Sequence, residues 1–206
     1  MSDKIQQLLQ SAEQQKASAS AEQSSVANAE RTFTNSIEAE NAFNDLKEKL
    51  FQISYWNKVS GVTSYAIFDE NGNDLGDKEM SLNDFLRISL PGSGKYDWVK
   101  IIDVHRAENE IVLTVQPTFN PTADAPDKDV TSHFFTDRAT NNFCLERKLE
   151  TVKFHVIGLN EISNTQETGG VVETIRNFAA ANVGSFTGFQ IAEWKTFCER
   201  FLQPDK

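Results

Sequence analysis

Residues 98–116, WVKIIDVHRAENEIVLTVQ, decide the fold class of this chain. Residues 98–105 and residues 110–116 are rich in β-branched and other apolar side chains, and the short stretch 107–109 between them suits a turn. Two β-prone segments joined so closely predict an antiparallel hairpin. The hairpin in turn predicts an antiparallel sheet in the middle of the chain.

Further β-prone segments flank this hairpin. On its N-terminal side, residues 63–68 lead into a turn at Asn71-Gly72, and Ser81 is expected to begin a short helix over residues 81–86. Together with the segments on its C-terminal side, they predict one curved antiparallel sheet or open barrel of five or six strands over residues 61–164. The C-terminal segments, of which the last two are expected to form a second hairpin, are residues 130–136, 142–147 and 151–159.

The C-terminal zone, residues 170–203, returns to helical periodicity. One helix is expected over residues 171–182 and ends at Gly184. A second is expected over residues 187–202. Because wide aromatic faces pack well on sheets, both helices are expected to cover the sheet. The apolar face of the second helix consists of Ile191, Trp194, Phe197, Cys198 and Phe201.

The N-terminal zone, residues 1–57, contains no Pro or Gly and is rich in Ala, Gln, Glu and Ser. It predicts one long helix, or a helical hairpin with a hinge in the low-complexity tract 14–25. Its weak apolar stripe needs a partner surface, which is either another protein or copy of this chain, or the chain's own domain. The predicted organisation is α+β, with an N-terminal helical arm over 1–57 and an α+β domain over 58–206.

Composition and charge exclude several classes of protein. No stretch of the chain approaches the roughly 20 consecutive apolar residues of a transmembrane helix. The formal net charge of −10, from 20 Lys and Arg against 30 Asp and Glu, argues against nucleic-acid binding and against an anionic membrane surface. It is compatible with a basic partner, but an acidic balance is also common in chains that are simply soluble. The N-terminus shows no apolar run of signal-peptide length, so we expect cytoplasmic residence.

One motif resembles a phosphate-binding loop. Residues 90–95, LPGSGK, end in Gly-Lys, but Ser89 stands where the first glycine belongs and Tyr96 replaces the hydroxyl residue that would hold magnesium. A β-prone segment also follows, where the motif needs a helix. A connecting loop explains this stretch better than a nucleotide site, and no cofactor is predicted.

A second motif resembles the start of a calcium loop. Asp69, Asn71 and Asn73 alternate as oxygen ligands do, but Gly72 stands at the fourth position instead of the sixth, and Met80 replaces the bidentate Glu. A tight turn explains the same residues. No metal site is predicted here.

The cysteines and histidines are weak candidates for catalysis. Cys144 and Cys198 lie far apart, and two buried thiols are a simpler interpretation than a disulfide. Cys144 is a candidate nucleophile if a histidine lies beside it as base, with Glu161 or Asp137 orienting the ring. The alternative is that Cys144 is an inert core residue. The histidines on predicted strands are His105, His133 and His155, of which His133 and His155 are the candidate bases.

Three functions remain open. The preferred interpretation is a non-enzymatic interaction or assembly protein that self-associates or binds a partner through its N-terminal helix, with the loop over residues 117–129 as a further contact. The first alternative is a carrier of a small hydrophobic ligand between sheet and helices, because the chain holds 15 Phe and 3 Trp. These aromatic residues can equally fill an ordinary core. The second alternative is an enzyme built on Cys144 and the histidines.

Overall fold

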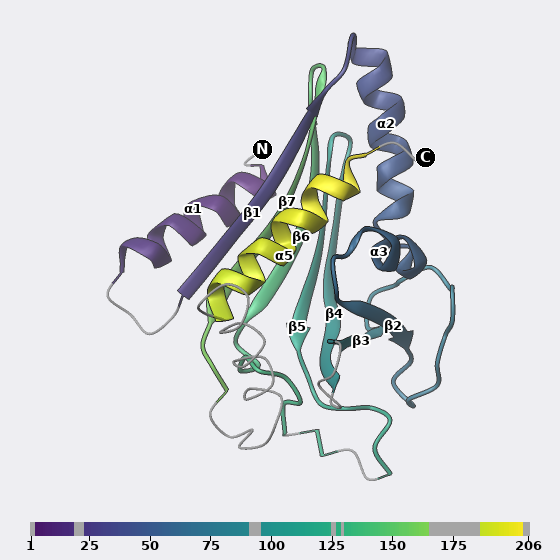
Figure 1. Cartoon of the computed structure of the whole chain (residues 1–206), viewed down its shortest axis with the longest axis vertical. Helices are drawn as coiled ribbons and strands as arrows, with labels where there is room; N and C mark the ends of the chain where they lie inside the picture. Colours follow the sequence, from purple (N-terminus) through teal and green to yellow (C-terminus); the bar gives the residue numbers. More distant parts are fainter. Residues whose placement is uncertain are drawn as a thin grey trace.

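The computed structural model describes residues 3–18, 23–90, 96–124, 127–128, 130–164 and 186–203, with only the backbone of residues 186–189. Its centre is a seven-stranded antiparallel sheet in the order β1-β7-β6-β5-β4-β3-β2, curved but not closed (Figure 1). The α+β class is confirmed, but the predicted five or six strands are too few. The strands are β1 (Gln23–Thr32), β2 (Ser64–Phe68), β3 (Phe85–Ser89), β4 (Tyr96–Ala107), β5 (Glu110–Pro117), β6 (Thr140–Lys148) and β7 (Thr151–Glu161).

Both predicted hairpins are confirmed: β4 pairs with β5, and β6 pairs with β7. Two local predictions were wrong. Residues 81–86 do not form a helix, because Phe85 and Leu86 lie in β3, where they bury their side chains in two different apolar clusters. Residues 130–136 form no strand and contribute only an isolated bridge, which joins Phe135 to Ser163.

The N-terminal zone is neither one long helix nor a helical hairpin. It contains α1 (Lys4–Ala17), the strand β1, α2 (Ser36–Lys49) and α3 (Ile53–Val59). β1 pairs with β7 along its length and buries Ser25 and Ala27. Ala, Ser and Glu favour a helix locally, but cross-strand pairing with a buried neighbour decides the conformation of such a segment. The low-complexity tract 14–25 therefore spans the end of α1 and the start of β1, with residues 19–22 outside the described part.

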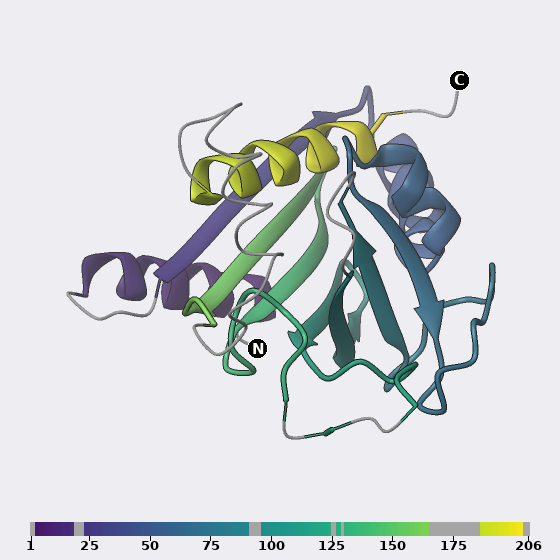
Figure 2. The same cartoon turned by 60° about the horizontal axis from the view of Figure 1, so that its bottom comes forward.

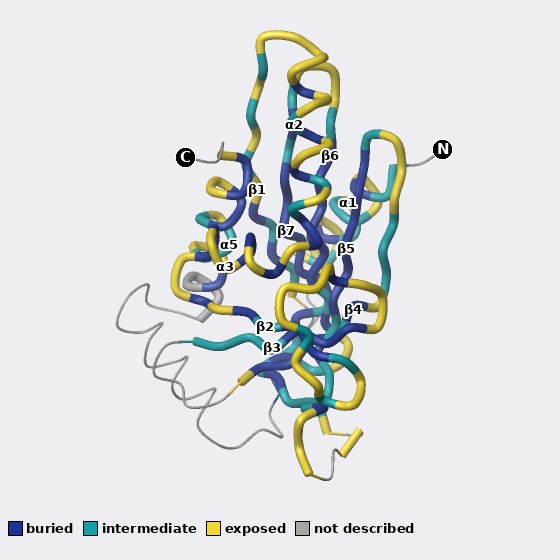
Figure 3. Tube along the Cα trace, turned by 90° about the vertical axis from the view of Figure 1, so that its right-hand side faces the viewer, coloured by how far each residue is buried: buried dark blue, intermediate teal, exposed yellow. Residues whose placement is uncertain are grey.

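Helices lie on both sides of the sheet. The central strands β5 to β7 are buried almost continuously along their length, which requires cover on both faces (Figure 3). Figure 2 shows α5 (Phe186–Phe201) on one side and α1 on the other. On the α5 side, the aromatic core brings together Trp56, Phe143, Phe154, Phe197 and Phe201.

α5 confirms the helix expected over residues 187–202, whereas the helix expected over 171–182 lies outside the described residues. Among the helices of the described ranges, none is long and apolar enough to cross a membrane.

α1 packs on the chain's own sheet. The Asp3 side chain accepts from the Ile5 N–H and begins the helix, which buries Ile5 and Ala12 against Val112, Cys144 and Ile157. Leu8 and Leu9 pack against the same cluster and are partly buried. Self-association through α1 and the division of the chain at residue 57 both stay predictions.

The C-terminal end of β7 contacts helices on both sides of the sheet. Asn160 adopts a left-handed conformation, with φ of 54°. Its N–H donates to the Gln15 side chain of α1, and the next residue, Glu161, accepts from Gln190 of α5.

Candidate functional site

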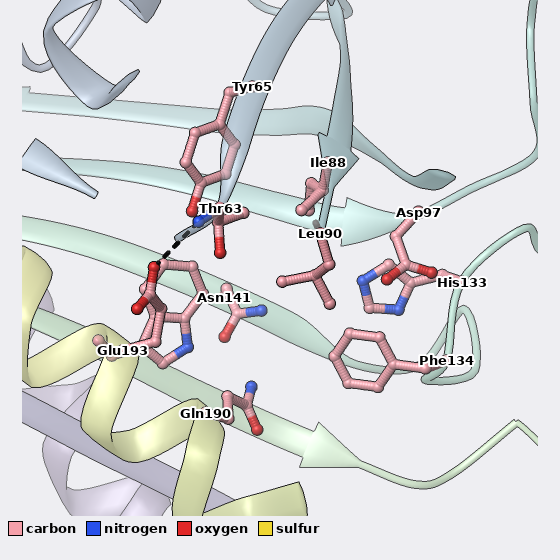
Figure 4. Close-up of a pocket in the computed structure, with 11 residues that line it drawn as sticks. Thr63, Tyr65, Ile88, Leu90, Asp97, His133, Phe134, Asn141, Gln190 and Glu193 are labelled. Carbon is pink, nitrogen blue, oxygen red and sulfur yellow. Dashed lines mark hydrogen bonds between the residues drawn. The ribbon is translucent and has the colours of Figure 1, made fainter. Parts of the chain in front are cut away.

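A cavity of about 60 Å³ lies between α5 and one end of the sheet (Figure 4). We name it the α5 cavity. Its walls come from α5, from β2, β3, β4 and β6, and from the segment that precedes β6. The lining residues are Thr63, Tyr65, Ile88, Leu90, Asp97, His133, Phe134, Asn141, Gln190, Glu193 and Trp194.

Three side-chain polar atoms that line this mainly apolar space form no hydrogen bond of good geometry with the described residues, although the Thr63 side chain lies near the Tyr65 hydroxyl. They are the Tyr65 hydroxyl oxygen, the Asn141 Oδ1 and the Trp194 Nε1, each buried from solvent. Buried polar groups are hydrogen-bonded in the great majority of cases, so three such atoms around one cavity need an explanation. Tyr65 can donate or accept, Asn141 Oδ1 accepts, and Trp194 donates.

Glu193 connects α5 to the segment that enters β2. Its Oε1 accepts from the backbone N–H groups of Gly61 at 2.9 Å, Val62 at 3.0 Å and Thr63 at 3.3 Å. A methyl group at position 61 would overlap the Glu193 carboxylate, so glycine leaves the space that this contact occupies. Burial, with a smaller contribution from the charge of Glu193, raises the pKa of Tyr65 and keeps its hydroxyl protonated.

His133 is a neutral part of the cavity wall. Its side chain is buried, its Nδ1 accepts from the Phe135 N–H at 2.9 Å, and its ring stacks on Phe134. Burial lowers the pKa of His133 to about 3. The ring therefore carries no charge at neutral pH.

Gln190 links the α5 cavity to a buried carboxylate. Its Nε2 donates to Glu161 Oε1 at 3.1 Å, and the Ser25 hydroxyl donates to the same oxygen at 2.9 Å. Both partners are uncharged, and burial raises the pKa of Glu161 to about 7. Gly158 lies beneath this carboxylate, where a methyl group would overlap both Glu161 and Ser25.

The candidate catalytic residues divide between the two sides of the sheet. Cys144 and His155 are directly paired across β6 and β7, but His133 lines the α5 cavity while Cys144 packs under α1. The Cys144 thiol is fully buried, and burial raises its pKa well above the usual range, which disfavours the reactive thiolate. His155 Nε2 lies 3.0 Å from Glu146 Oε1. Catalysis at Cys144 stays a prediction.

The other residues named from the sequence lie outside this site. Glu161 contacts Ser25 and Gln190 instead of a histidine, and the Asp137 backbone carbonyl accepts from Gln116. His105 Nε2 lies 3.1 Å from Glu110 Oε1 at the N-terminus of α1. Among the described residues, no group of three or more His, Cys, Asp or Glu is arranged to hold a metal ion.

The two incomplete motifs have different outcomes. Asp69 Oδ1 accepts from the N–H groups of Asn71 and Asn73, each at 2.9 Å, and Gly72 has a φ of 78°. This is the tight turn expected there. The glycine-rich stretch over residues 91–95 lies outside the described part of the chain.

Sequence reasoning did not select Tyr65, Asn141, Gln190 or Glu193. Tyr65, Gln190 and Glu193 lie in predicted elements, and Asn141 directly precedes the strand predicted over residues 142–147. No local motif connects the four residues, because the fold alone brings them together. Trp194 was selected only as part of an apolar helix face. A small signal was available in Gly61, whose missing side chain leaves room for Glu193.

No protein-family model and no curated protein matches this chain. Among solved structures, it is similar to a hypothetical protein from Helicobacter pylori, at 9% identity over 86% of each chain with a TM-score of 0.46. It is also similar to norcoclaurine synthase from Thalictrum flavum, at 9% identity over 84% of this chain and 89% of that chain, with a TM-score of 0.40. Major latex-like protein 151 from Panax ginseng matches at 8% identity over 73% and 88%, with a TM-score of 0.36. Similarities this distant carry no argument about function.

Proposed function

We propose that this chain binds a small, mainly apolar molecule in the α5 cavity. The observation that supports the proposal is the set of three buried, unpartnered polar atoms on Tyr65, Asn141 and Trp194. An unpaired buried polar group costs about 1–3 kcal/mol, and a ligand with matching groups would remove that cost. A few placed polar groups in an apolar wall are typical of ligand sites.

The packing of the core limits the size of the ligand. Phe143, Phe154, Phe197 and Phe201 pack on one another and on Trp56, so the space between α5 and the central strands is largely filled. The α5 cavity lies toward one end of the sheet and is much smaller than the roughly 300–1,000 Å³ of pockets for drug-sized ligands. The proposed ligand is therefore at most one ring in size, and the cavity must widen to admit it.

Carrier function replaces assembly as the preferred interpretation. The assembly hypothesis depended on an N-terminal helix in need of a partner, but α1 buries Ile5 and Ala12 on its own sheet. The α5 cavity has polar atoms in need of a partner. Residence in the cytoplasm and binding of a basic protein stay predictions.

The test compares the substitution of Tyr65, at the cavity, with that of Tyr55, away from it. We expect para-methylbenzyl alcohol to bind the native chain, measured by calorimetry and by tryptophan fluorescence. Tyr65→Phe is expected to weaken binding about 5- to 10-fold while leaving the unfolding free energy of the ligand-free protein unchanged or higher, because the deleted hydroxyl has no partner there.

Tyr55→Phe is the matched control. The Tyr55 hydroxyl donates to the Phe201 carbonyl at 3.1 Å, away from the α5 cavity. Its loss is expected to lower the unfolding free energy by about 1 kcal/mol with no change in binding. Equal effects of the two substitutions on binding, or a large loss of stability in Tyr65→Phe, would contradict the proposal.

A further inference from the structure

The charged groups around the α5 cavity are all acidic. Its described lining includes the carboxylates of Asp97 and Glu193 but no Lys and no Arg. The remaining titratable side chains are neutral, since burial lowers the pKa of His133 and raises that of Tyr65. The described lining therefore offers negative charge and hydrogen-bonding groups, and none of its residues is a cation that would receive an anionic ligand.

Glu193 is held by backbone groups in this arrangement. Its Oε1 is held by the backbone N–H groups of residues 61–63, which are dipoles and do not neutralise a carboxylate. Its field reaches the cavity, because it contributes to the raised pKa of Tyr65. Charge interactions are stronger in a partly dehydrated site than in water, so a carboxylate here discriminates between ligands of opposite charge.

Polar groups are present at both ends of the lining. Figure 4 shows Tyr65, Asn141 and Glu193 toward one end, and Leu90 and Phe134 beside Asp97 and His133 toward the other. The Tyr65 hydroxyl oxygen and Asn141 Oδ1 are unpartnered acceptors in residues more than nine-tenths buried. An ammonium group donates three hydrogen bonds and accepts none, which matches two such acceptors beside a carboxylate.

We propose that the α5 cavity selects a small apolar amine, with its protonated nitrogen toward Tyr65, Asn141 and Glu193, and that it rejects carboxylates such as fatty acids. This inference rests on the proposed function and adds the chemical class of the ligand. The apolar body of the amine contacts Leu90 and Phe134, and Trp194 adds an aromatic ring to the lining.

The experiment compares three molecules with the same ring and methyl group. Para-methylbenzylamine, para-methylbenzyl alcohol and para-methylbenzoate are titrated calorimetrically into the native full-length chain at neutral pH and low salt. We expect the amine to bind about tenfold more tightly than the alcohol, and the benzoate to bind at least tenfold more weakly than the alcohol.

Two variants of α5 test the role of Glu193. Glu193→Gln retains an oxygen for the three N–H groups but loses the charge, and it is expected to reduce the amine preference to about twofold. Glu199→Gln makes the same change in net charge at an exposed position of α5 that does not line the cavity. It is expected to leave the preference unchanged.

A third comparison changes the ligand and leaves the protein unaltered, so a mutation cannot affect folding in it. Para-methylbenzyl-trimethylammonium keeps the positive charge but has no N–H donor, and we expect it to bind at least tenfold more weakly than the amine. Benzoate binding as tightly as the amine, or an equal effect of the two Glu variants, would overturn the amine inference while leaving the proposed function intact. Failure of all the neutral and charged ligands to bind would overturn the proposed function itself.

Discussion

Glu146 and Glu161 are two carboxylates with similar burial on opposite sides of the sheet, and their pKa values move in opposite directions. Glu146, 3% exposed, lies on the α1 side with His155 at 3.0 Å and Lys148 at 2.7 Å, and these partners lower its pKa to about 2. Glu161, 6% exposed, contacts only uncharged partners on the α5 side, and burial raises its pKa to about 7. The partners of a buried acid therefore decide the sign of its shift.

The same contrast separates the contacts that hold α1 on the sheet from the arrangement at the α5 cavity. On the α1 side, carboxylates contact cationic groups and the N-terminus of α1, which fastens the helix to the sheet. At the α5 cavity, the polar groups meet backbone dipoles and neutral side chains, and some form no hydrogen bond of good geometry with the described residues. The second arrangement is the one in which we propose a ligand.

Deletion of residues 1–57 is expected to have the largest effect, because it removes structure from both sides of the sheet. It removes β1 and also Phe43, Leu50 and Trp56 from the main core. We expect the remaining chain to show no cooperative thermal transition by circular dichroism, because β7 and the α5 side of the sheet would lose their cover. A folded, cooperative remainder would instead support the division of the chain at residue 57.

Two glycines beside carboxylates of the α5 side test how far each carboxylate can move. Gly158→Ala is expected to lower the unfolding free energy by about 2–3 kcal/mol, since the methyl group would overlap the buried Glu161 carboxylate. In Gly61→Ala, the added methyl group would contact the half-buried Glu193 side chain, which can move. We therefore expect the unfolding free energy to fall by less than about 1 kcal/mol. Urea unfolding followed by tryptophan fluorescence measures both, and equal losses would contradict the difference.

Glu146 and Glu161 are expected to make stability depend on pH in opposite directions. The pKa of Glu161 is higher in the folded chain, so the folded state binds the extra proton, and stability falls as pH rises from about 4.5 to 7. Glu161→Gln removes this fall. From about pH 5 to about pH 8, the unfolding free energy of the variant should therefore rise by about 1–3 kcal/mol relative to that of the native chain. The measurement is urea unfolding at both pH values.

Glu146→Gln should behave in the opposite way. The pKa of Glu146 is lowered in the folded chain, so its ionised form adds stability above about pH 4.5 that is lost as pH falls toward about 2. The substitution should therefore cost about 1–3 kcal/mol at neutral pH and little in strong acid. A constant cost at every pH would show that packing, and not charge, sets the effect.

The sequence predicts the parts of the fold that local signals decide. Residues 98–116 and 142–159 form their hairpins because each pair of strands is adjacent in the chain, and α5 follows from its apolar periodicity. β1 was missed because its pairing with β7 joins segments far apart in the chain. The α5 cavity was missed for the same reason, since Tyr65, Asn141 and Glu193 come from three separate elements.

Asn160, in its left-handed conformation, lies where the end of β7 contacts helices on both sides of the sheet. Asn160 contacts Gln15 of α1, and the adjacent Glu161 holds Gln190 of α5 at the cavity wall. Two adjacent residues thus contact two helices that the sheet otherwise separates. We therefore expect a displacement of α1 that moves Asn160 to move the neighbouring Glu161 carboxylate, and with it the contact to Gln190, as well.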